Sequence, residues 1–330
     1  MTQHPVDPGS AAGADLDPDI RRFIHTVGAG FARYPDFATL PHPRMRQVAE
    51  EVRAPWAAGG PAMANRRDLS ISTRAGSVRL RIHNPSARTR KPAFIYLHGG
   101  GWTIFSINTH DRLMREYAAR ADVVVIGVDY ALSPEAKFPT ALEQIVDVVR
   151  WARKYSEELG IDANRIAVGG DSAGGNLTMA ACLKLRDEGE PNAVRAMVLN
   201  YAALGEHSEQ ANRRYGGAGY MLGGDEMEVF WRNYARDAAD LKNPLLRPLH
   251  AQLGGLPPAF LAIAECDVLT EQNIAMAEKL RAAGVPVQAV VYQGASHSFL
   301  EAVSIAAVSD RALSETSQWL RTVLEQAPAA

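Results

Sequence analysis

The sequence contains little cysteine, almost no net charge and no long apolar run, and each absence excludes a class of protein. Only two of its 330 residues are cysteines, and neither Cys182 nor Cys266 belongs to a CxxC pair or lies near a spaced histidine, which disfavours zinc and thioredoxin-like chemistry. The formal net charge of -2 argues against a nucleic-acid partner, because phosphate binding needs a concentrated basic face. Apolar runs such as residues 123–128 are far shorter than the roughly 18 residues of a membrane span.

The beginning of the chain also lacks the pattern of a secretory signal. Residues 1–20 are polar and acidic, without a basic start followed by an apolar stretch. A cytoplasmic location is therefore the default expectation. With 47% hydrophobic and 22% charged residues, the composition is that of an ordinary globular protein.

Short β-branched runs alternate with amphipathic stretches along most of the chain. Residues 69–73 and 78–84 alternate apolar and polar side chains around Ala75-Gly76, which predicts a hairpin. Six more strands are expected, each apolar along its length, at residues 93–97, 123–128, 165–168, 193–199, 259–264 and 286–292. Apolar strands separated by helices indicate a mostly parallel sheet with both faces covered, so the predicted fold class is α/β.

Helix signals occur between these strands. The apolar spacing from residue 138 to 149 predicts a helix with Pro139 in its first turn and Gly160 at its C-terminal end. A second helix is expected from Asn273 to Ala283, where Gly284 ends it.

One long connection does not fit a simple alternation. About sixty residues separate the strand ending near Leu199 from the one starting at Ala259, whereas roughly two to six are usual. Residues 215–234, expected to be helical and aromatic-rich, and the similar residues 20–37 predict a cap over the carboxyl edge of the sheet, where ligands bind in such folds. The alternative is that these aromatics only pack the cap onto the core. The expected division is an N-terminal cap segment at 1–50, core at 51–204, cap insertion at 205–244 and core at 245–330.

The motif Gly170-Asp171-Ser172-Ala173-Gly174 lies directly after a predicted strand and before a helical run. This strand–turn–helix context is the one that a nucleophile elbow requires. Side chains two residues before and after the serine would crowd the sharp turn, which explains the glycines. The alternative is a glycine-rich phosphate turn or a plain loop.

A second motif, His98-Gly99-Gly100-Gly101-Trp102, follows the strand at 93–97. Backbone without a Cβ can approach a reacting oxygen closely, so the amides of Gly100 and Gly101, with that of Ala173, are candidate donors to the oxyanion of acyl transfer. We interpret His98 as a brace for this loop and not as the catalytic base.

Two side chains follow neighbouring strands and suit the roles of acid and base. Asp267 comes after the strand at 259–264 and His297 after the strand at 286–292, and parallel strands share their carboxyl edge. The chain order Ser172, Asp267, His297 is that of α/β-hydrolases, unlike chymotrypsin or subtilisin.

Other residues compete for these two roles. His250, in a loop before a strand, is the alternative base, and Glu265 and Glu271 are alternative acids. Asp267 is preferred because it lies just beyond the strand, whereas Glu271 is expected inside the next helix.

Taken together, the motifs resemble the hormone-sensitive-lipase family of α/β-hydrolases (the bacterial family IV carboxylesterases), and they are most similar to its acetyl esterase branch. The matching segments, in family order, are His98–Trp102 with Thr109-His110-Asp111, Asp129–Glu135 with Phe138-Pro139, Gly170–Gly175, Asp267–Leu269 and His297–Phe299. The resemblance covers about residues 90 to 300. It implies an α/β-hydrolase fold with a mostly parallel eight-stranded sheet, flanking helices and a helical cap.

The resemblance also implies the roles of the site residues. Ser172 would be the nucleophile, His297 the base and Asp267 the acid, with the amides of Gly100, Gly101 and Ala173 as the oxyanion hole. No cofactor or metal is implied. The expected activity is that of a serine carboxylesterase acting on a small-molecule ester through an acyl-enzyme intermediate.

Three departures from the family pattern bear on the substrate. Phe105 stands where many relatives have glycine, and its bulk would narrow the pocket beside the oxyanion loop. Ala131 replaces a common arginine and Ser298 a common glycine, and neither change removes a reacting group. Phe105 and the similarity to the acetyl esterase branch together lead us to expect a preference for short, acetyl-like acyl chains. The predicted pocket residues are Trp102, Phe105, Tyr220, Phe230 and Trp231.

Several other functions use the same residues. An amidase, lactonase or acyltransferase would have the same triad, and a ligand receptor could share the fold. The plant gibberellin receptors resemble the family but lack the catalytic histidine, so the presence of His297 disfavours a receptor. Family members often pair through their last strand and helix, and a homodimer is expected by that analogy.

Overall fold

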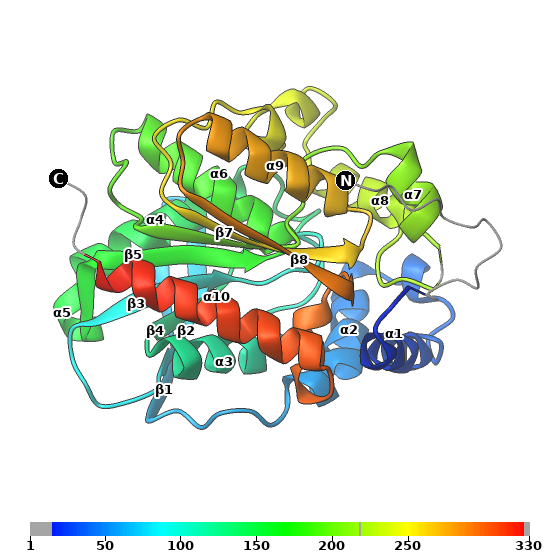
Figure 1. Ribbon diagram of the computed structural model, residues 1–330, viewed down its shortest axis with the longest axis horizontal. Helices are drawn as coiled ribbons and strands as arrows, with labels where there is room; N and C mark the ends of the chain where they lie inside the picture. Colours follow the sequence, from blue (N-terminus) through cyan, green and yellow to red (C-terminus); the bar gives the residue numbers. More distant parts are fainter. Residues whose placement is uncertain (1–14, 218, 327–330) are drawn as a thin grey trace.

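The computed structural model describes residues 15–217 and 219–326, which fold around one eight-stranded sheet (Figure 1). Its strand order is β1-β2-β4-β3-β5-β6-β7-β8. β1 is antiparallel to β2, and β2 is antiparallel to β4, whereas all other neighbours are parallel. The predicted α/β fold class is confirmed. The strands are β1 (Asn65–Thr73), β2 (Gly76–Asn84), β3 (Lys91–Leu97), β4 (Val124–Asp129), β5 (Ile161–Asp171), β6 (Ala196–Asn200), β7 (Ala259–Cys266) and β8 (Val287–Ser296).

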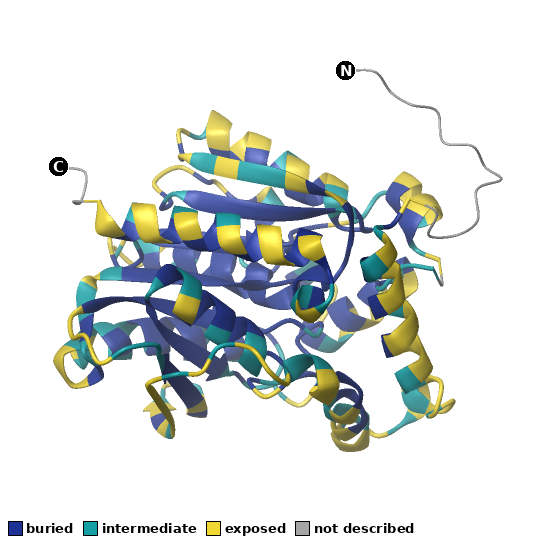
Figure 2. Ribbon diagram, turned by 60° about the horizontal axis from the view of Figure 1, so that its bottom comes forward, coloured by how far each residue is buried: buried dark blue, intermediate teal, exposed yellow. Residues whose placement is uncertain are grey.

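Helices cover both faces of the sheet. On one face lie α3 (Asp111–Ala121) and α10 (Ala307–Glu325), and on the other α4 (Thr140–Lys154), α6 (Ala173–Asp187) and α9 (Thr270–Ala282). The central strands are apolar throughout because neither face meets water, and all seven residues of β3 are buried. Figure 2 shows the buried sheet between helices that expose only their outer sides.

Three predicted helix boundaries were wrong. The helix expected to run from Pro139 to Gly160 is interrupted at Tyr155, whose φ of -102° leaves the helical region, so α4 is followed by the short α5 (Ser156–Leu159). Pro139 is the N-cap of α4 and not a residue of its first turn. α9 begins at Thr270, three residues before the predicted start at Asn273.

Helices from two distant parts of the chain gather at the carboxyl ends of the strands. α1 (Pro18–Phe31) and α2 (His42–Ala57) lie there with α7 (Glu209–Tyr215) and α8 (Gly224–Tyr234), on the right of Figure 1. α1 packs through Ile20, Phe23 and Val27, the apolar stripe of an amphipathic helix. The first 14 residues of the expected cap segment 1–50 lie outside the described residues. Within the described ranges, none of the helices combines the length and hydrophobicity needed to span a bilayer.

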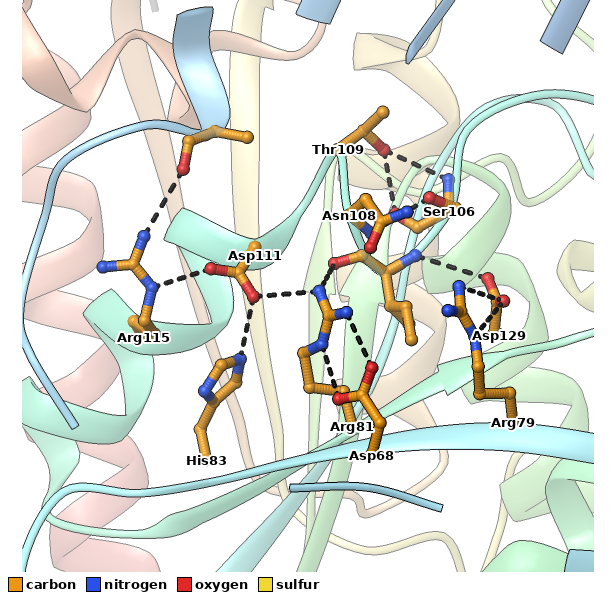
Figure 3. Close-up of polar contacts among 12 residues, drawn as sticks. Asp68, Arg79, Arg81, His83, Ser106, Asn108, Thr109, Asp111, Arg115 and Asp129 are labelled. Carbon is orange, nitrogen blue, oxygen red and sulfur yellow. Dashed lines mark hydrogen bonds and ion pairs between the residues drawn. The ribbon is translucent and has the colours of Figure 1, made fainter. Parts of the chain in front are cut away.

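A network of hydrogen bonds and ion pairs connects the hairpin β1–β2 with the first turn of α3 (Figure 3). The guanidinium of Arg81 on β2 donates two hydrogen bonds to Asp68 of β1, at 2.9 and 2.8 Å, and a third to Asp111 of α3, at 3.1 Å. Arg115 donates to the other oxygen of Asp111 at 2.8 Å. Burial opposes ionisation of Asp111, but hydrogen bonds from His83 and Arg115 outweigh it and lower the pKa of this carboxyl. The start of α3 is therefore held against the sheet.

Candidate active site

Ser172 occupies a strained turn between β5 and α6. Its φ of 52° and ψ of -117° form a combination that residues with a side chain rarely adopt. A Cβ at Gly170 or Gly174 would collide with the carbonyl of Leu97 at the end of β3. The glycines are thus required by the neighbouring strand as well as by the turn itself. The Ser172 amide donates to the Asn200 carbonyl at 2.9 Å, which ties the turn to β6.

The structure brings Ser172, His297 and Asp267 into one hydrogen-bonded chain. His297 Nε2 lies 2.9 Å from Ser172 Oγ, and His297 Nδ1 lies 2.7 Å from Asp267 Oδ2. Asp267 follows β7 and His297 follows β8, so adjacent parallel strands deliver both side chains to the same edge. The three residues are only 5%, 6% and 2% exposed, in the order serine, histidine, aspartate. This arrangement allows a proton to pass from serine to imidazole.

The competing residues from the sequence lie elsewhere. His250 Nε2 is 3.0 Å from the carboxylate of Glu206. Glu265 accepts a hydrogen bond from the Gly294 amide at 2.9 Å, and Glu271 lies in the first turn of α9. The carboxylate that is bonded to His297 is that of Asp267.

The environment of His297 favours its protonated form. Burial lowers its pKa, but the charge of Asp267 and the hydrogen bond to it outweigh burial, so the pKa of His297 is raised. Asp171 and Glu226 add smaller contributions in the same direction. An imidazole with a raised pKa is a stronger proton acceptor.

The glycine-rich loop after β3 lies against the same site. Gly100 and Gly101 have φ values of 103° and 57°, in the left-handed region that favours glycine. A Cβ on Gly101 would overlap the ring of Phe230, so the backbone approaches α8 closely there. Ala173 is the first residue of α6, where amides have no partner within the helix and the helix dipole is positive. Gly100 and Gly101 thus line the same cavity as Ser172, and Ala173 follows the serine directly.

Asp171 is buried and has a role that its position in the motif did not reveal. Its Oδ1 accepts hydrogen bonds from the Tyr96 hydroxyl at 2.7 Å and from the Gly99 amide at 3.1 Å. Its Oδ2 lies 3.2 Å from His110 Nε2. Asp171 therefore joins the serine turn to the glycine-rich loop. The sequence signal that could have indicated this role is a charged residue between the apolar strand and the serine of the Gly170–Gly174 motif.

His98 braces this loop, as the sequence predicted. Its Nδ1 lies 2.7 Å from the carbonyl of Gly99, and its ring stacks on Tyr130 with centroids 4.3 Å apart. Burial, followed by the charge of His110, lowers the pKa of His98 to about 4, so His98 is neutral at physiological pH.

A cavity of about 540 Å³ opens beside Ser172 and His297. Phe105, Tyr220 and Phe230 line it, as do the following further residues: Ile24, His25, Val27, Gly28, Ala29, Phe31, Ala32, Phe37, Arg53, Gly100, Gly101, Ile104, Met221, Leu222, Glu226 and Ser298. Most of these side chains are apolar, which suits a neutral organic substrate. Arg53 and Glu226 are the charged exceptions, and no local sequence pattern pointed to either.

Two predicted pocket residues belong to the packing of the cap instead. Trp102 is absent from the cavity wall because its ring stacks on Tyr234, with centroids 4.6 Å apart and planes 3° apart. Trp231 packs on Trp102 with centroids 4.5 Å apart and is likewise buried. Tyr220 and Met221 both line the cavity. They lie in the loop between α7 and α8, although the sequence predicted a helix there.

Two of the departures from the family pattern have unusual backbone. Phe105 and Ser298, which replace common glycines, have φ values of 69° and 61°. The backbone has a conformation that favours glycine although a larger residue stands at each position.

As for metals, the described ranges contain no group of three or more His, Cys, Asp or Glu side chains that could hold an ion.

Comparison with known proteins gives a consistent answer. A family model described as the alpha/beta hydrolase fold matches residues 94–301. An ethyl acetate hydrolase of Pseudomonas putida is 34% identical over 310 residues, which cover 90% of this chain and 96% of that protein. An arylesterase of Saccharolobus solfataricus is 36% identical over 287 residues, covering 86% of this chain and 92% of that protein.

Solved structures agree with the sequence comparison. The hyperthermophilic esterase from the archaeon Pyrobaculum calidifontis matches with a TM-score of 0.86 at 32% identity, covering 93% of this chain and 98% of that one. The chain therefore belongs to the hormone-sensitive-lipase family of α/β-hydrolases, the bacterial family IV esterases, and is a carboxylic ester hydrolase.

Proposed function

We propose that this esterase hydrolyses short-chain, acetyl-like esters, with Ser172 as nucleophile, His297 as base and Asp267 as the orienting acid. The observation that carries the proposal is the hydrogen-bonded chain from Asp267 through His297 to Ser172, which opens onto a cavity bounded by Phe105. Similarity to an ethyl acetate hydrolase supports the short-chain preference.

In the first half of the reaction, His297 takes the proton of Ser172 as the serine oxygen attacks the ester carbonyl. The negative charge that develops on the carbonyl oxygen is stabilised by the amides of Gly100, Gly101 and Ala173. Collapse of the tetrahedral intermediate breaks the bond to the alcohol, which leaves with the proton from His297. The acyl group remains on Ser172.

In the second half, water replaces the alcohol. His297 removes a proton from the water, which attacks the acyl carbonyl of the acyl-enzyme, and the same three amides stabilise the second oxyanion. The acid is released when His297 returns the proton to Ser172. Asp267 holds the imidazole in the tautomer that presents Nε2 to the serine. These steps use only groups of the chain and water.

The chain-length preference is tested by steady-state hydrolysis of nitrophenyl esters of increasing acyl length. We expect kcat/KM to fall steeply beyond a few carbons because the Phe105 ring narrows the cavity beside the oxyanion loop. A preference for long acyl chains would contradict this part of the proposal. Amides, lactones and an added alcohol acceptor, tested at matched concentration, distinguish the alternative activities of the same triad.

The nucleophile is tested with Ser172→Ala. This variant should retain the fold, shown by its thermal unfolding, and lose turnover of the acetyl ester. Ser317→Ala is the matched control, because Ser317 is a buried serine of α10 whose hydroxyl has no hydrogen-bond partner within the described residues. Appreciable turnover by folded Ser172→Ala would exclude Ser172 as the nucleophile.

A further inference from the structure

The active-site cavity contains a cation that the proposed mechanism does not use. Arg53 of α2 lines the same cavity as Ser172 and His297, and its side chain is only 4% exposed. Burying a guanidinium is costly unless its charge is paired and its N–H groups are hydrogen-bonded. The partners of this side chain therefore show whether the protein satisfies all of its hydrogen-bond donors.

The charge of Arg53 is paired, but its hydrogen bonds are incomplete. Nη1 donates to Glu301 Oε2 at 3.0 Å, and both side chains are buried. Nη2 reaches only the sulfur of Met221, at 3.7 Å, which is a weak acceptor. Nε of Arg53 and Oε1 of Glu301 are buried and have no partner among the described residues. The two-bond pairing that a guanidinium and a carboxylate usually form is absent.

The aromatic neighbours of Arg53 keep its guanidinium next to the cavity. Its Cζ lies 4.9 Å from the ring centroid of Phe105 and 5.6 Å from that of Phe23, distances typical of cation–π contacts. Phe105 and Met221, which both contact Arg53, line the cavity themselves. A substrate seated against Phe105 therefore lies beside a guanidinium whose Nη2 has, among the described residues, only the weak sulfur acceptor of Met221.

We propose that Arg53 determines specificity by donating a hydrogen bond to a second, uncharged oxygen of the substrate, such as an ether, ketone or ester oxygen outside the scissile group. The proposal rests on the proposed function, since it assigns the substrate class of the same site. The second oxygen gives Nη2 of Arg53 a strong acceptor, whereas a hydrocarbon chain of equal length would leave it with the Met221 sulfur alone.

The charges around the cavity favour a neutral oxygen over a carboxylate. Glu301 already balances the charge of Arg53, so a carboxylate on the substrate would bring an excess negative charge into the site. Glu226 lines the same cavity and adds a carboxyl group to its wall. An anionic substrate would lie near this second acid.

The test compares esters that differ only by oxygen in place of a methylene group. Ethyl methoxyacetate and ethyl butyrate form the acyl-side pair, and 2-methoxyethyl acetate and butyl acetate form the alcohol-side pair. Within each pair, the ratio of kcat/KM is measured for the wild type and for each variant. Because the intrinsic reactivity of the two esters is the same for every variant, a change in the ratio reports on the protein alone.

Three variants isolate Arg53. Arg53→Met combined with Glu301→Gln removes the donors without leaving an unpaired buried carboxylate, whereas Glu301→Gln alone keeps Arg53. Arg44→Met is the matched control, because Arg44 lies on the same helix but is exposed and pairs with Glu51. Thermal unfolding of each variant shows that its fold is intact.

We expect the oxygen-to-methylene ratio of at least one pair to fall roughly tenfold in the double variant, the loss expected for one hydrogen bond from a charged donor. The ratio should be retained in Glu301→Gln and in Arg44→Met. Unchanged ratios for both pairs in the double variant would overturn the proposal. A preference for ethyl hydrogen malonate that depends on Arg53 would also overturn it, because Arg53 would then bind a carboxylate.

A second measurement needs only the wild type. 2-Methoxyethanol and methoxyacetamide are compared with 1-butanol and butyramide as competitive inhibitors of ester hydrolysis, and at least one oxygen-containing compound should bind more tightly than its more hydrophobic counterpart. Tighter binding of both hydrocarbon compounds would contradict the proposal. The short-chain preference is tested separately, by the series of nitrophenyl esters. If that preference fails, the oxygen-to-methylene ratios of kcat/KM can still be measured.

Discussion

At the scale of single residues, the ionisation of His297 controls the activity that we propose. Burial lowers the pKa of His297, but Asp267 outweighs burial and raises it above the ordinary value of about 6.5. Only the neutral imidazole can accept the Ser172 proton. Activity should therefore fall as pH drops through this raised pKa.

Asp267→Asn should move the acid limb of the pH profile of kcat/KM to lower pH. The substitution removes the charge that raises the pKa of His297, whereas burial, which lowers it, remains. Loss of the oriented tautomer should also reduce the rate, by roughly 1,000-fold or more. Glu265→Gln is the control, since Glu265 bonds to the Gly294 amide, and its profile should keep the wild-type limb. An acid limb that stays in place in Asp267→Asn would contradict this account.

Phe105 makes a prediction about stability because its φ of 69° favours glycine. Phe105→Gly and Phe105→Ala both remove the ring, but alanine retains a left-handed penalty of roughly 1–2 kcal/mol, against about 0.5–1 kcal/mol of extra chain entropy for glycine. We expect the free energy of unfolding in urea to be equal or higher for the glycine variant. Both variants should accept longer acyl chains than the wild type. An alanine variant that is clearly the more stable would show that this backbone is not strained.

Residues differ in how well sequence alone indicates their role. Ser172, Asp267 and His297 were proposed because each follows a recognisable strand, and parallel strands bring their carboxyl ends together. Arg53 and Glu301 are 248 positions apart and belong to no local motif, so their pairing required the structure. The sequence also could not separate Trp102, which packs the cap, from Phe230, which lines the cavity.

At the scale of elements, Asp171 connects the serine turn after β5 with the loop after β3 and with the residue preceding α3. Burial raises the pKa of Asp171, but the charge of His110 outweighs burial and lowers it. Burial likewise lowers the pKa of His110, and Asp171 outweighs burial and raises it. The carboxylate contribution to stability is lost as pH falls through the lowered pKa. The imidazolium contribution is lost as pH rises through the raised one.

Asp171→Asn should therefore reduce stability most between about pH 4 and 6.5, the window set by the ordinary pKa values of the two groups. Removing one partner of a buried ion pair costs about 3–5 kcal/mol, measured as the free energy of unfolding in urea. The rate should fall as well, because the Gly99 amide next to the oxyanion loop loses a charged acceptor. A stability difference that is constant from pH 3 to 9 would mean that the two groups do not act as an ion pair.

The elements themselves were predicted unevenly, and the reason is physical. All eight strands were predicted: the hairpin strands β1 and β2 from their alternating side chains, and the other six because strands between covered faces must be apolar, as β3 is. The ends of helices were less predictable. α4 stops at Tyr155 without a glycine or proline there, and α9 begins before its apolar residues do.

At the scale of the whole molecule, the homodimer expected from the family remains a prediction. β8 is an edge strand of the described sheet, and Val291 on it is 43% exposed. Exposed edge strands pair readily with a second copy unless charge prevents it. We expect light scattering to give twice the chain mass for the wild type and the single-chain mass for Val291→Lys. A monomeric wild type would exclude pairing through this edge.

The central claim for the molecule is that helices α1, α2 and α8, a glycine-rich loop and three strand ends place one reactive serine in an apolar cavity. Labelling with a nitrophenyl phosphonate ester, followed by peptide mass spectrometry, tests this claim most directly, because the phosphonate stays bonded to the nucleophile. We predict one equivalent of label on Ser172, complete loss of ester hydrolysis, and no labelling of Ser172→Ala. Label on a different residue, or continued hydrolysis by enzyme fully labelled at Ser172, would contradict it.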